Sequence, residues 1–416
     1  MRRTGSAVAI RDLPYPYRAA LTITGDLDDL RTARDFVEVV RFLGGTGETP
    51  LGTGLGLELS HSFWFYDTCG DSEFTVFREG GPELTAHAGL IADLVASGHV
   101  DTMHTYGNFS EGGFRRAHAE RALSFLRERR IAVPVWVNHG GTKNTQMVGD
   151  LPEQLGDDPG SVEYHTDLMA ECGVRFVETF DVTHTVGQDA PATLRDRAVQ
   201  TYEVARYLAS GDRGRAERVY RNALVEPRTL GDGGRFFSFK RFIGRGHGME
   251  SAGSAELALQ LSPDVLSELV RKRGWMSVYT HPWRNPGGAA LIAPAAVQAL
   301  RGLAAEAAAG RIYVTTTSRL LTLNLVTRRL VWSSERLDGK RVVRIAHVDD
   351  EVAGRWAPSR SDLSGVTFYV ESPHETRVFV GEDEIDGLVP NPPDETGRPS
   401  VSVPLKRLPA PDLPEF

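Results

Sequence analysis

Four short apolar runs in this sequence are each followed by residues that could do chemistry. In chain order, the polar residues after these runs are Asp26, Asp28 and Asp29; His104 and Asn108; Asn138 and His139; and His281. Architectures that alternate strands with helices carry their functional groups at the carboxyl ends of parallel strands. If the four runs are such strands, these side chains meet at one edge of a sheet.

The carboxylates after the first run indicate a bound cation. Asp26, Asp28 and Asp29 lie so close together in the chain that their charges repel one another unless a cation neutralises them. His104 can add a nitrogen ligand from another strand end, and mixed Asp and His ligands are typical of catalytic Zn²⁺ sites. The alternative is that the three aspartates form a turn and cap a helix that begins near Arg31.

The segments around these residues have the pattern of repeated βα units. From Ala19 to about Thr317, apolar runs alternate with segments in which apolar residues recur at helical spacing. Glycines follow several of the helical segments, as is usual at helix C-caps. The predicted helices are 82–97, 114–126, 164–171, 264–272 and 294–309, and the predicted strands that follow them are 100–103, 131–137, 174–180, 275–280 and 311–315.

Two stretches and the tail depart from this pattern. Residues 140–158 and 188–253 are polar and contain many glycines, with one predicted helix at about 193–210, and we interpret them as insertions on a rim. After about residue 328, short strand candidates are separated by turn residues, which indicates a small antiparallel β-domain. We therefore predict an α/β fold with two domains, 1–328 and 329–416.

Composition and charge exclude several classes of function. The 416-residue chain has 47 Lys and Arg against 55 Asp and Glu, a formal charge of −8, so a nucleic-acid partner is not expected. No segment approaches the ~18 uninterrupted apolar residues of a membrane span, and residues 1–12 lack the apolar run of a signal peptide. We therefore expect a cytoplasmic protein without an integral membrane segment. With only Cys69 and Cys172 available, a metal must be bound mainly by His, Asp or Asn.

These motifs resemble the polysaccharide deacetylase (NodB-type) superfamily. The shared features are a strand followed by Asp-x-Asp at 26–28, the sequence Gly-His-x-x-x-x-His-Thr-Tyr at 98–106, and a late strand that ends in His281. The resemblance covers about residues 15–320. It implies a distorted (β/α)7 barrel, here with rim insertions and followed by the small C-terminal antiparallel β-domain.

The resemblance also implies a role for each matching residue. Asp26 corresponds to the catalytic base and Asp28 to a metal ligand, with Asp29 as a substitute for either. His104 matches the first histidine of the family's metal-binding His-x-x-x-His motif. His281 corresponds to the general acid that protonates the leaving group.

The sequence departs from the family at the second metal-binding histidine. That position is Asn108, whose carbonyl oxygen is a weaker ligand than imidazole. His99 or His139 could supply the missing nitrogen, and Asn138 is a further candidate beside His139. The family's Arg-x-Pro-Tyr motif has no match, and the segment 135–140 occupies a comparable strand end.

Substrate contacts are expected near the same strand ends. A backbone N–H at Tyr106 or Gly107 would help to hold an oxyanion, and Trp283 follows His281 closely. Tyr106 and Trp283 are therefore the predicted substrate-contacting residues.

The expected function is metal-dependent hydrolysis of an N-acyl or O-acyl group on a carbohydrate or glycoconjugate, with zinc as the favoured divalent ion. One rival is a metal-independent glycoside hydrolase on a similar barrel, which would pair Glu178 with Asp26 or Asp181. The other rival is a non-catalytic carbohydrate-binding protein, in which Asn108 marks a degenerate deacetylase site.

Overall fold

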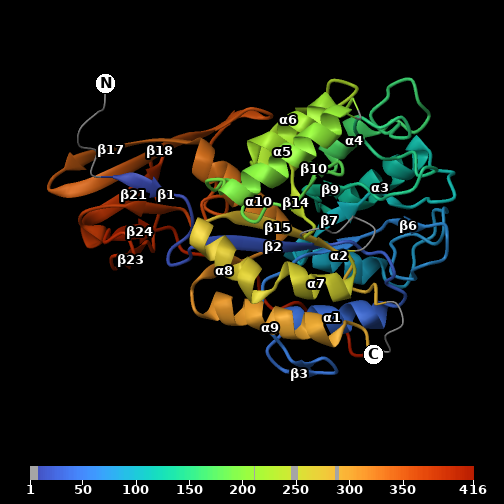
Figure 1. The fold of residues 1–416 in the computed structure, drawn as a ribbon, viewed down its shortest axis with the longest axis horizontal. Helices are drawn as coiled ribbons and strands as arrows, with labels where there is room; N and C mark the ends of the chain where they lie inside the picture. The colour runs from blue at the N-terminus through green and yellow to red at the C-terminus, as the bar shows by residue number, and fades with distance from the viewer. Residues whose placement is uncertain (1–7, 210, 245–251, 286–289) are drawn as a thin grey trace.

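The fold is organised around one large curled sheet with helices packed outside it (Figure 1). The structure is a computed structural model that describes residues 8–209, 211–244, 252–285 and 290–416. The 11-stranded sheet contains, in spatial order, β11 (Val182–Thr183), β14 (Arg241–Phe242), β15 (Trp275–Thr280), β2 (Ala19–Gly25), β5 (His61–Phe63), β7 (Val100–His104), β9 (Val135–Val137), β10 (Phe176–Glu178), β13 (Arg235–Phe239) and β12 (Val225–Thr229), with β16 (Ile312–Val314) beside β2.

The strands that carry the predicted site run parallel to one another. β2 pairs in parallel with β15 and β5, and β7 pairs in parallel with β5 and β9. All residues of β2 and β15 are buried, as expected for parallel strands covered on both faces. The carboxyl ends of these strands therefore lie at one edge of the sheet, as the sequence predicts.

A kinked extended segment connects the two ends of the curled sheet. β13 pairs in parallel with β10, and β14, one residue further along, pairs in parallel with β15. Lys240 is the single residue between β13 and β14. Sequence reasoning treated this part of the chain as a rim insertion, so its contribution to the sheet corrects that interpretation. Residues 245–251 of the predicted insertion lie outside the described residues.

Helices cover the curled sheet on its outer side (Figure 1). In chain order they are α1 (Ala33–Gly44), α2 (Ala88–Ser97), α3 (Arg116–Arg129), α4 (Thr166–Glu171), α5 (Leu194–Ala209), α6 (Arg213–Arg221), α7 (Ser254–Gln260), α8 (Pro263–Lys272), α9 (Pro294–Ala308) and α10 (Thr317–Arg329). No helix of the described residues has both the length and the apolar character needed to cross a bilayer.

Local signals account for most of these boundaries. Pro263 opens α8, where its fixed φ suits the first turn, and Gly98 ends α2 with a φ of 82°. The strand predicted at 275–280 has the bounds of β15. The helix predicted from residue 82 begins six residues later at Ala88, because residues 82–87 form irregular structure and a short bridge instead.

The tail after α10 forms two further sheets. One has the order β17 (Leu330–Leu337), β18 (Lys340–Asp350), β21 (Thr376–Val380) and β22 (Asp383–Glu384), with β19 (Gly354–Trp356) also beside β18; the other has the order β1 (Ala9–Arg11), β20 (Thr367–Tyr369), β24 (Ser400–Ser402) and β23 (Val389–Asn391). The predicted strands exist, but β18 and β21 are parallel, so the tail is not purely antiparallel. β1, from the N-terminus, lies among these tail strands (Figure 1).

The tail shares a hydrophobic core with the large sheet. One buried cluster contains Leu320 and Leu321 of α10 together with Val343 and Ile345 of β18. A separate, larger cluster fills the space between the large sheet and its covering helices. The tail is thus packed against α10 and is joined by β1.

Candidate metal centre

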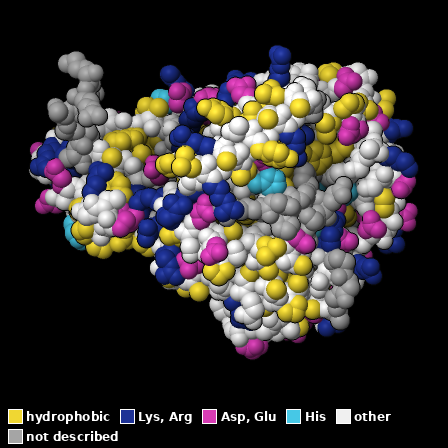
Figure 2. Space-filling model, viewed as in Figure 1, with side chains coloured by type: hydrophobic (Ala, Val, Ile, Leu, Met, Phe, Trp, Pro, Cys, Tyr) yellow, Lys and Arg dark blue, Asp and Glu magenta, His cyan; other side chains and the backbone are white. Residues whose placement is uncertain are grey.

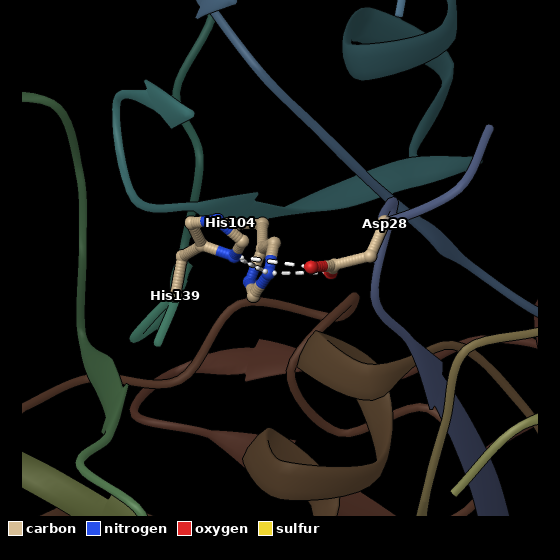
Figure 3. Close-up of side chains that lie close together, drawn as sticks. All are labelled: Asp28, His104 and His139. Carbon is tan, nitrogen blue, oxygen red and sulfur yellow. Dashed lines mark hydrogen bonds and ion pairs between the residues drawn. The ribbon is translucent and has the colours of Figure 1, made fainter. Parts of the chain in front are cut away.

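Three side chains converge at the carboxyl edge of the large sheet. Asp28 follows β2, His104 ends β7 and His139 follows β9, and Figure 3 shows them pointing toward one another. His104 Nε2 lies 3.0 Å from Asp28 Oδ2, and His139 Nδ1 lies 3.2 Å from Asp28 Oδ1. The two ring nitrogens are 3.1 Å apart. We call these three residues the Asp28 cluster.

The separations within the Asp28 cluster suit a tetrahedral ion. Zinc bonds of about 2.0–2.1 Å place tetrahedral ligand atoms about 3.3 Å from one another. The observed separations of 3.0, 3.1 and 3.2 Å are close to that value. Three protein ligands leave a fourth position open for water or substrate, which is the arrangement of catalytic zinc sites.

The second nitrogen of each histidine faces a polar side chain outside the cluster. His104 Nδ1 is buried without a hydrogen-bond partner and lies 3.8 Å from Asp26 Oδ1. If Nε2 binds a cation, Nδ1 carries the proton and faces this carboxylate. His139 Nε2 lies 3.2 Å from the hydroxyl oxygen of Ser110, which can accept a hydrogen bond from Nε2–H. Such outer contacts orient histidine ligands in metal sites.

The electrostatics of the Asp28 cluster favour an ionised carboxylate. Burial would raise the pKa of Asp28, but the charges and hydrogen bonds of His139 and His104 outweigh it and hold the pKa well below its usual range. Burial would likewise lower the pKa of His139, but Asp28 outweighs it and raises this pKa. The Asp28 carboxylate therefore attracts positive charge. A bound metal ion would supply this charge, as a protonated histidine does.

Asp26 is held by a buried arginine that sequence reasoning did not single out. Arg241 of β14 donates from one nitrogen to both oxygens of Asp26, at 2.8 and 2.9 Å, and from another to Glu178 Oε2 at 2.9 Å. All three side chains are buried. Burial and the charges of Asp181 and Asp26 raise the pKa of Glu178 to about 7, although Arg241 opposes them.

His281 lies on the other side of Asp28. Its Nε2 is 3.5 Å from Asp28 Oδ2 and 3.4 Å from the Tyr279 hydroxyl, and its Nδ1 lies 3.2 Å from the carbonyl oxygen of Ala252. Atoms of Asp26, Asp28 and His281 lie within 4.8 Å of one another. Burial lowers the pKa of His281, whereas Asp28 and Asp26 act in the opposite direction. The structure thus brings together five of the residues that sequence reasoning selected, namely Asp26, Asp28, His104, His139 and His281.

Asn108 lies outside the Asp28 cluster. Residues 107–108 form β8 (Gly107–Asn108), which pairs with β6 (Tyr66–Asp67) in a separate small sheet. Asn108 Nδ2 donates to Asp71 at 2.7 Å, and its Oδ1 accepts from the backbone N–H of Ser110 at 3.1 Å. The chain bends at Thr105, whose φ is 54°, and then enters β8, so Asn108 does not lie one helical turn beyond His104. His139 occupies the position expected for Asn108.

Two further ligand candidates have structural roles. Asn138 accepts from the Trp136 indole at 2.9 Å and donates to the carbonyl oxygen of Val148 at 2.8 Å. Its amide therefore binds the loop that contains Val148 to the end of β9. His99 precedes β7 at the opposite edge of the sheet, with Nδ1 3.0 Å from the Ser97 hydroxyl. Neither is therefore a ligand in this arrangement.

Asp29 lies on the rim and forms an ion pair. Its Oδ2 accepts from Arg284 Nε at 2.7 Å, and the Asp29 side chain is 48% exposed. The alternative that the aspartates cap the next helix is also not met, because Thr32 caps α1 by accepting from the Asp35 N–H. Asp26 and Asp28 therefore remain available to the site.

The side chains of Tyr106 and Trp283 lie in the core. Tyr106 is fully buried, and its ring contacts Phe114 and Trp136. Its backbone N–H already donates to Gln146 Oε1 at 2.9 Å, so it is not free to hold an oxyanion. Trp283 stacks on Phe36 with ring centroids 5.9 Å apart. The substrate contacts that we predicted for Tyr106 and Trp283 do not fit these positions.

The glycoside hydrolase alternative pairs Glu178 with Asp26 or Asp181, and all three carboxylates are engaged in buried ion pairs. Asp26 shares Arg241 with Glu178. Glu178 is bonded to Arg241, and Asp181 accepts from Arg218 at 2.9 Å and from Arg228 at 3.0 Å. Each is at most 5% exposed. A pair of acids facing a sugar across an open cleft is therefore not formed by any two of these residues.

Comparisons with known proteins add no assignment. No family model, no curated protein and no solved structure matches this chain significantly. The interpretation of the site accordingly depends on its geometry.

Proposed function

We propose that this chain is a metal-dependent hydrolase that removes an N-acyl or O-acyl group from a carbohydrate or glycoconjugate. The observation that carries the proposal is the Asp28 cluster, with Asp26 on one side and His281 on the other. A divalent ion held by Asp28, His104 and His139, with zinc favoured, would polarise the acyl carbonyl and lower the pKa of water. We also propose that the curled sheet is a variant of the distorted (β/α)7 barrel of the superfamily that the sequence resembles.

Asp26 is proposed to accept a proton from the attacking water. Arg241 binds both of its oxygens and so orients the carboxylate, and each oxygen retains a further lone pair that can accept a proton. Asp26 Oδ1 lies 3.8 Å from His104 Nδ1, which places this carboxylate next to the Asp28 cluster. General base catalysis of this kind contributes typically 10²–10⁴-fold to rate.

His281 is proposed to donate a proton to the departing amine or alcohol. The backbone carbonyl of Ala252 can accept from Nδ1–H, and the other nitrogen then points toward Asp28. Burial lowers the pKa of His281, and the charges of Asp28 and Asp26 offset only part of this effect, so the ring is proposed to carry the proton only in passing, on its way to the leaving group. The fixed ring orientation favours proton transfer at one atom, Nε2.

A non-catalytic binding protein is less well supported. That alternative depends on Asn108 standing where a metal-binding histidine is expected, and His139 now supplies a third ligand. No observation in the described residues favours a degenerate site over a functional one.

The test is acyl release from a panel of N-acetylated and O-acetylated saccharides. We expect turnover by the purified protein to be abolished by a chelator and restored by Zn²⁺. Asp26→Asn is expected to lower kcat by about 10²–10⁴-fold, whereas the rim variant Asp29→Asn, as the matched control, retains it. Turnover that survives metal removal, or that Asp26→Asn leaves unchanged, would refute the proposal.

A further inference from the structure

Helix α5 has the opposite polarity to an ordinary surface helix. Its buried residues are Asp196, Gln200 and Glu203, whereas Leu194 is 85% exposed and Tyr202 is 70% exposed. Surface helices normally turn their apolar stripe toward the core and their charges toward water. The inner face of α5 is polar because it packs on charged groups: Lys272 bonds Asp196 at 2.6 Å, and His184 lies 3.5 Å from Glu203.

The exposed face of α5 carries a largely apolar stripe, which Thr201 interrupts. At 100° per residue, the outward positions fall within a sector of about 120°. These exposed residues are Leu194, Ala198, Thr201, Tyr202, Ala205, Leu208 and Ala209. Tyr220 of α6, at 74% exposure, adds a further aromatic ring to the same helical hairpin. Four of the eleven large hydrophobic residues exposed in the described chain therefore lie on α5 and α6.

Arginines flank this apolar stripe. Arg197 lies on one side of it on the helix, and Arg195 and Arg206 lie on the other, all of them exposed. Residues 194–221 contain seven Arg and four acidic residues, 7 − 4 = +3, in a chain with a net charge of −8. Figure 2 shows hydrophobic side chains with Lys and Arg among them over the part of the molecule where Figure 1 draws α5 and α6.

The acidic residues of the hairpin lie either on the inner face of α5 or on α6, where they offset two of the α6 arginines. Two of them, Asp196 and Glu203, are buried on the inner face. Asp212 caps α6 and lies 3.5 Å from Arg215, and Glu217 is paired with Arg221. The outward face of α5 therefore presents apolar groups and the three arginines Arg195, Arg197 and Arg206, while both acidic residues of this helix are buried.

We propose that the α5–α6 hairpin docks on an anionic lipid bilayer, with Leu194, Tyr202 and Leu208 inserted at the headgroup boundary. Exposed Leu and aromatic residues bordered by arginine are the features of helices that lie in a membrane interface. Charge complementarity selects this occupant, because basic residues next to a bilayer are attracted by anionic headgroups. The inference does not depend on the proposed hydrolase function.

The inner side of the α5–α6 hairpin contacts residues that follow two strands of the large sheet. Arg218 of α6 bonds Asp181, which follows β10, and Glu203 of α5 faces His184, which follows β11. The hairpin therefore touches the carboxyl edge of the sheet, where the Asp28 cluster also lies. A bilayer docked on the outward face of α5 would therefore be separated from that edge by the hairpin itself.

The experiment is vesicle co-sedimentation of the purified full chain. The probes are vesicles of phosphatidylcholine alone and of phosphatidylcholine with 30 mol% phosphatidylglycerol. We expect binding to the anionic vesicles that high salt weakens, and at least tenfold weaker binding to the neutral ones. Leu194→Ser/Tyr202→Ser/Leu208→Ser and, separately, Arg195→Gln/Arg197→Gln/Arg206→Gln are each expected to lower the partition coefficient at least tenfold. The matched control Val331→Ser/Leu337→Ser/Val389→Ser, on the tail sheets, is expected to bind like wild type.

Each outcome decides the question. All substituted side chains are exposed, and thermal unfolding of every variant checks that the fold is retained. No binding of the wild type to anionic vesicles, or equal binding of the apolar variant, would overturn the proposal. So would a dimer that the apolar variant converts to monomer in the absence of vesicle binding, which would assign this face to a second copy. Because no turnover is measured, failure here leaves the hydrolase proposal untouched.

Discussion

Arg241 binds both carboxylate oxygens of Asp26, at 2.8 and 2.9 Å, although the two residues are separated by more than half of the chain. The guanidinium comes from the kinked segment that joins β10 to β15, and a second nitrogen bonds Glu178. A planar guanidinium can hold two carboxylates in fixed directions, which an ammonium group cannot do. This pairing sets the orientation of the proposed base.

Arg241→Lys tests that orientation. The lysine keeps the charge but cannot bond both Asp26 oxygens and Glu178 together, so we expect kcat to fall about 10–100-fold with zinc affinity unchanged. The matched control is Arg284→Lys, which alters an arginine–aspartate pair on the rim. Steady-state kinetics and zinc titration check both variants. Full turnover by Arg241→Lys would show that the pairing is structural only.

His281→Ala separates proton donation from metal binding. We expect kcat to fall about 100-fold on N-acetylated sugars, whose amine must be protonated on departure. With an acetyl ester of nitrophenol, which leaves without a proton, the expected loss is less than about fivefold. Zinc affinity should stay near that of the wild type. Equal losses on both substrates would contradict the role of general acid.

Glu178→Gln distinguishes the hydrolase proposal from the glycoside hydrolase alternative. Glutamine still accepts a hydrogen bond from Arg241, so we expect at most about a tenfold loss of deacetylation, which remains sensitive to chelation. A glycoside hydrolase would instead lose nearly all activity and be insensitive to chelation. Assays of acyl release and of reducing ends, run in parallel, check this outcome.

The stability of the protein should fall as the pH drops below about 6.5. Burial lowers the pKa of His165 to about 4, so the folded protein keeps this ring neutral while the unfolded chain protonates it. The contribution of His165 to the free energy of unfolding is fully present above about pH 6.5, the pKa of the ring in the unfolded chain. It is lost as the pH falls to about 4, which lowers the free energy of unfolding by about 3 kcal/mol.

Urea unfolding between pH 7.5 and 4.5 measures this contribution. His165→Gln should show a weaker pH dependence than the wild type, whatever its absolute stability. His374→Gln, at an exposed position, is the control and should keep the wild-type slope. Equal slopes for His165→Gln and the wild type would contradict the expectation.

The sequence allowed prediction of the strand ends but not of every contact between them. β2, β7, β9 and β15 are short apolar runs directly followed or ended by polar residues, so Asp26, Asp28, His104, His139 and His281 could be selected in advance. The choice between Asn108 and His139 could not be made in advance, because it depends on the bend at Thr105 that places Asn108 in another sheet.

Arg241 shows a second limit of sequence reasoning. It lies in a stretch whose polar and glycine-rich composition indicated a rim insertion, and no local pattern reveals a partner 215 residues away. The available signal was the sequence Phe-Phe-Ser-Phe at 236–239, which forms most of β13. We predicted no strand there. The β1 strand was missed for the same reason, since its pairing with β20 joins opposite ends of the chain.

Zinc titration of the metal-free protein by calorimetry tests most directly whether Asp28, His104 and His139 bind one ion together. We predict one equivalent bound by the wild type and by the controls Asn108→Ala and His99→Ala, and at least about 100-fold weaker binding by His139→Ala, His104→Ala and Asp28→Ala. Wild-type protein that binds no zinc, or a His139→Ala variant that binds it as tightly as the wild type, would contradict the metal centre described above.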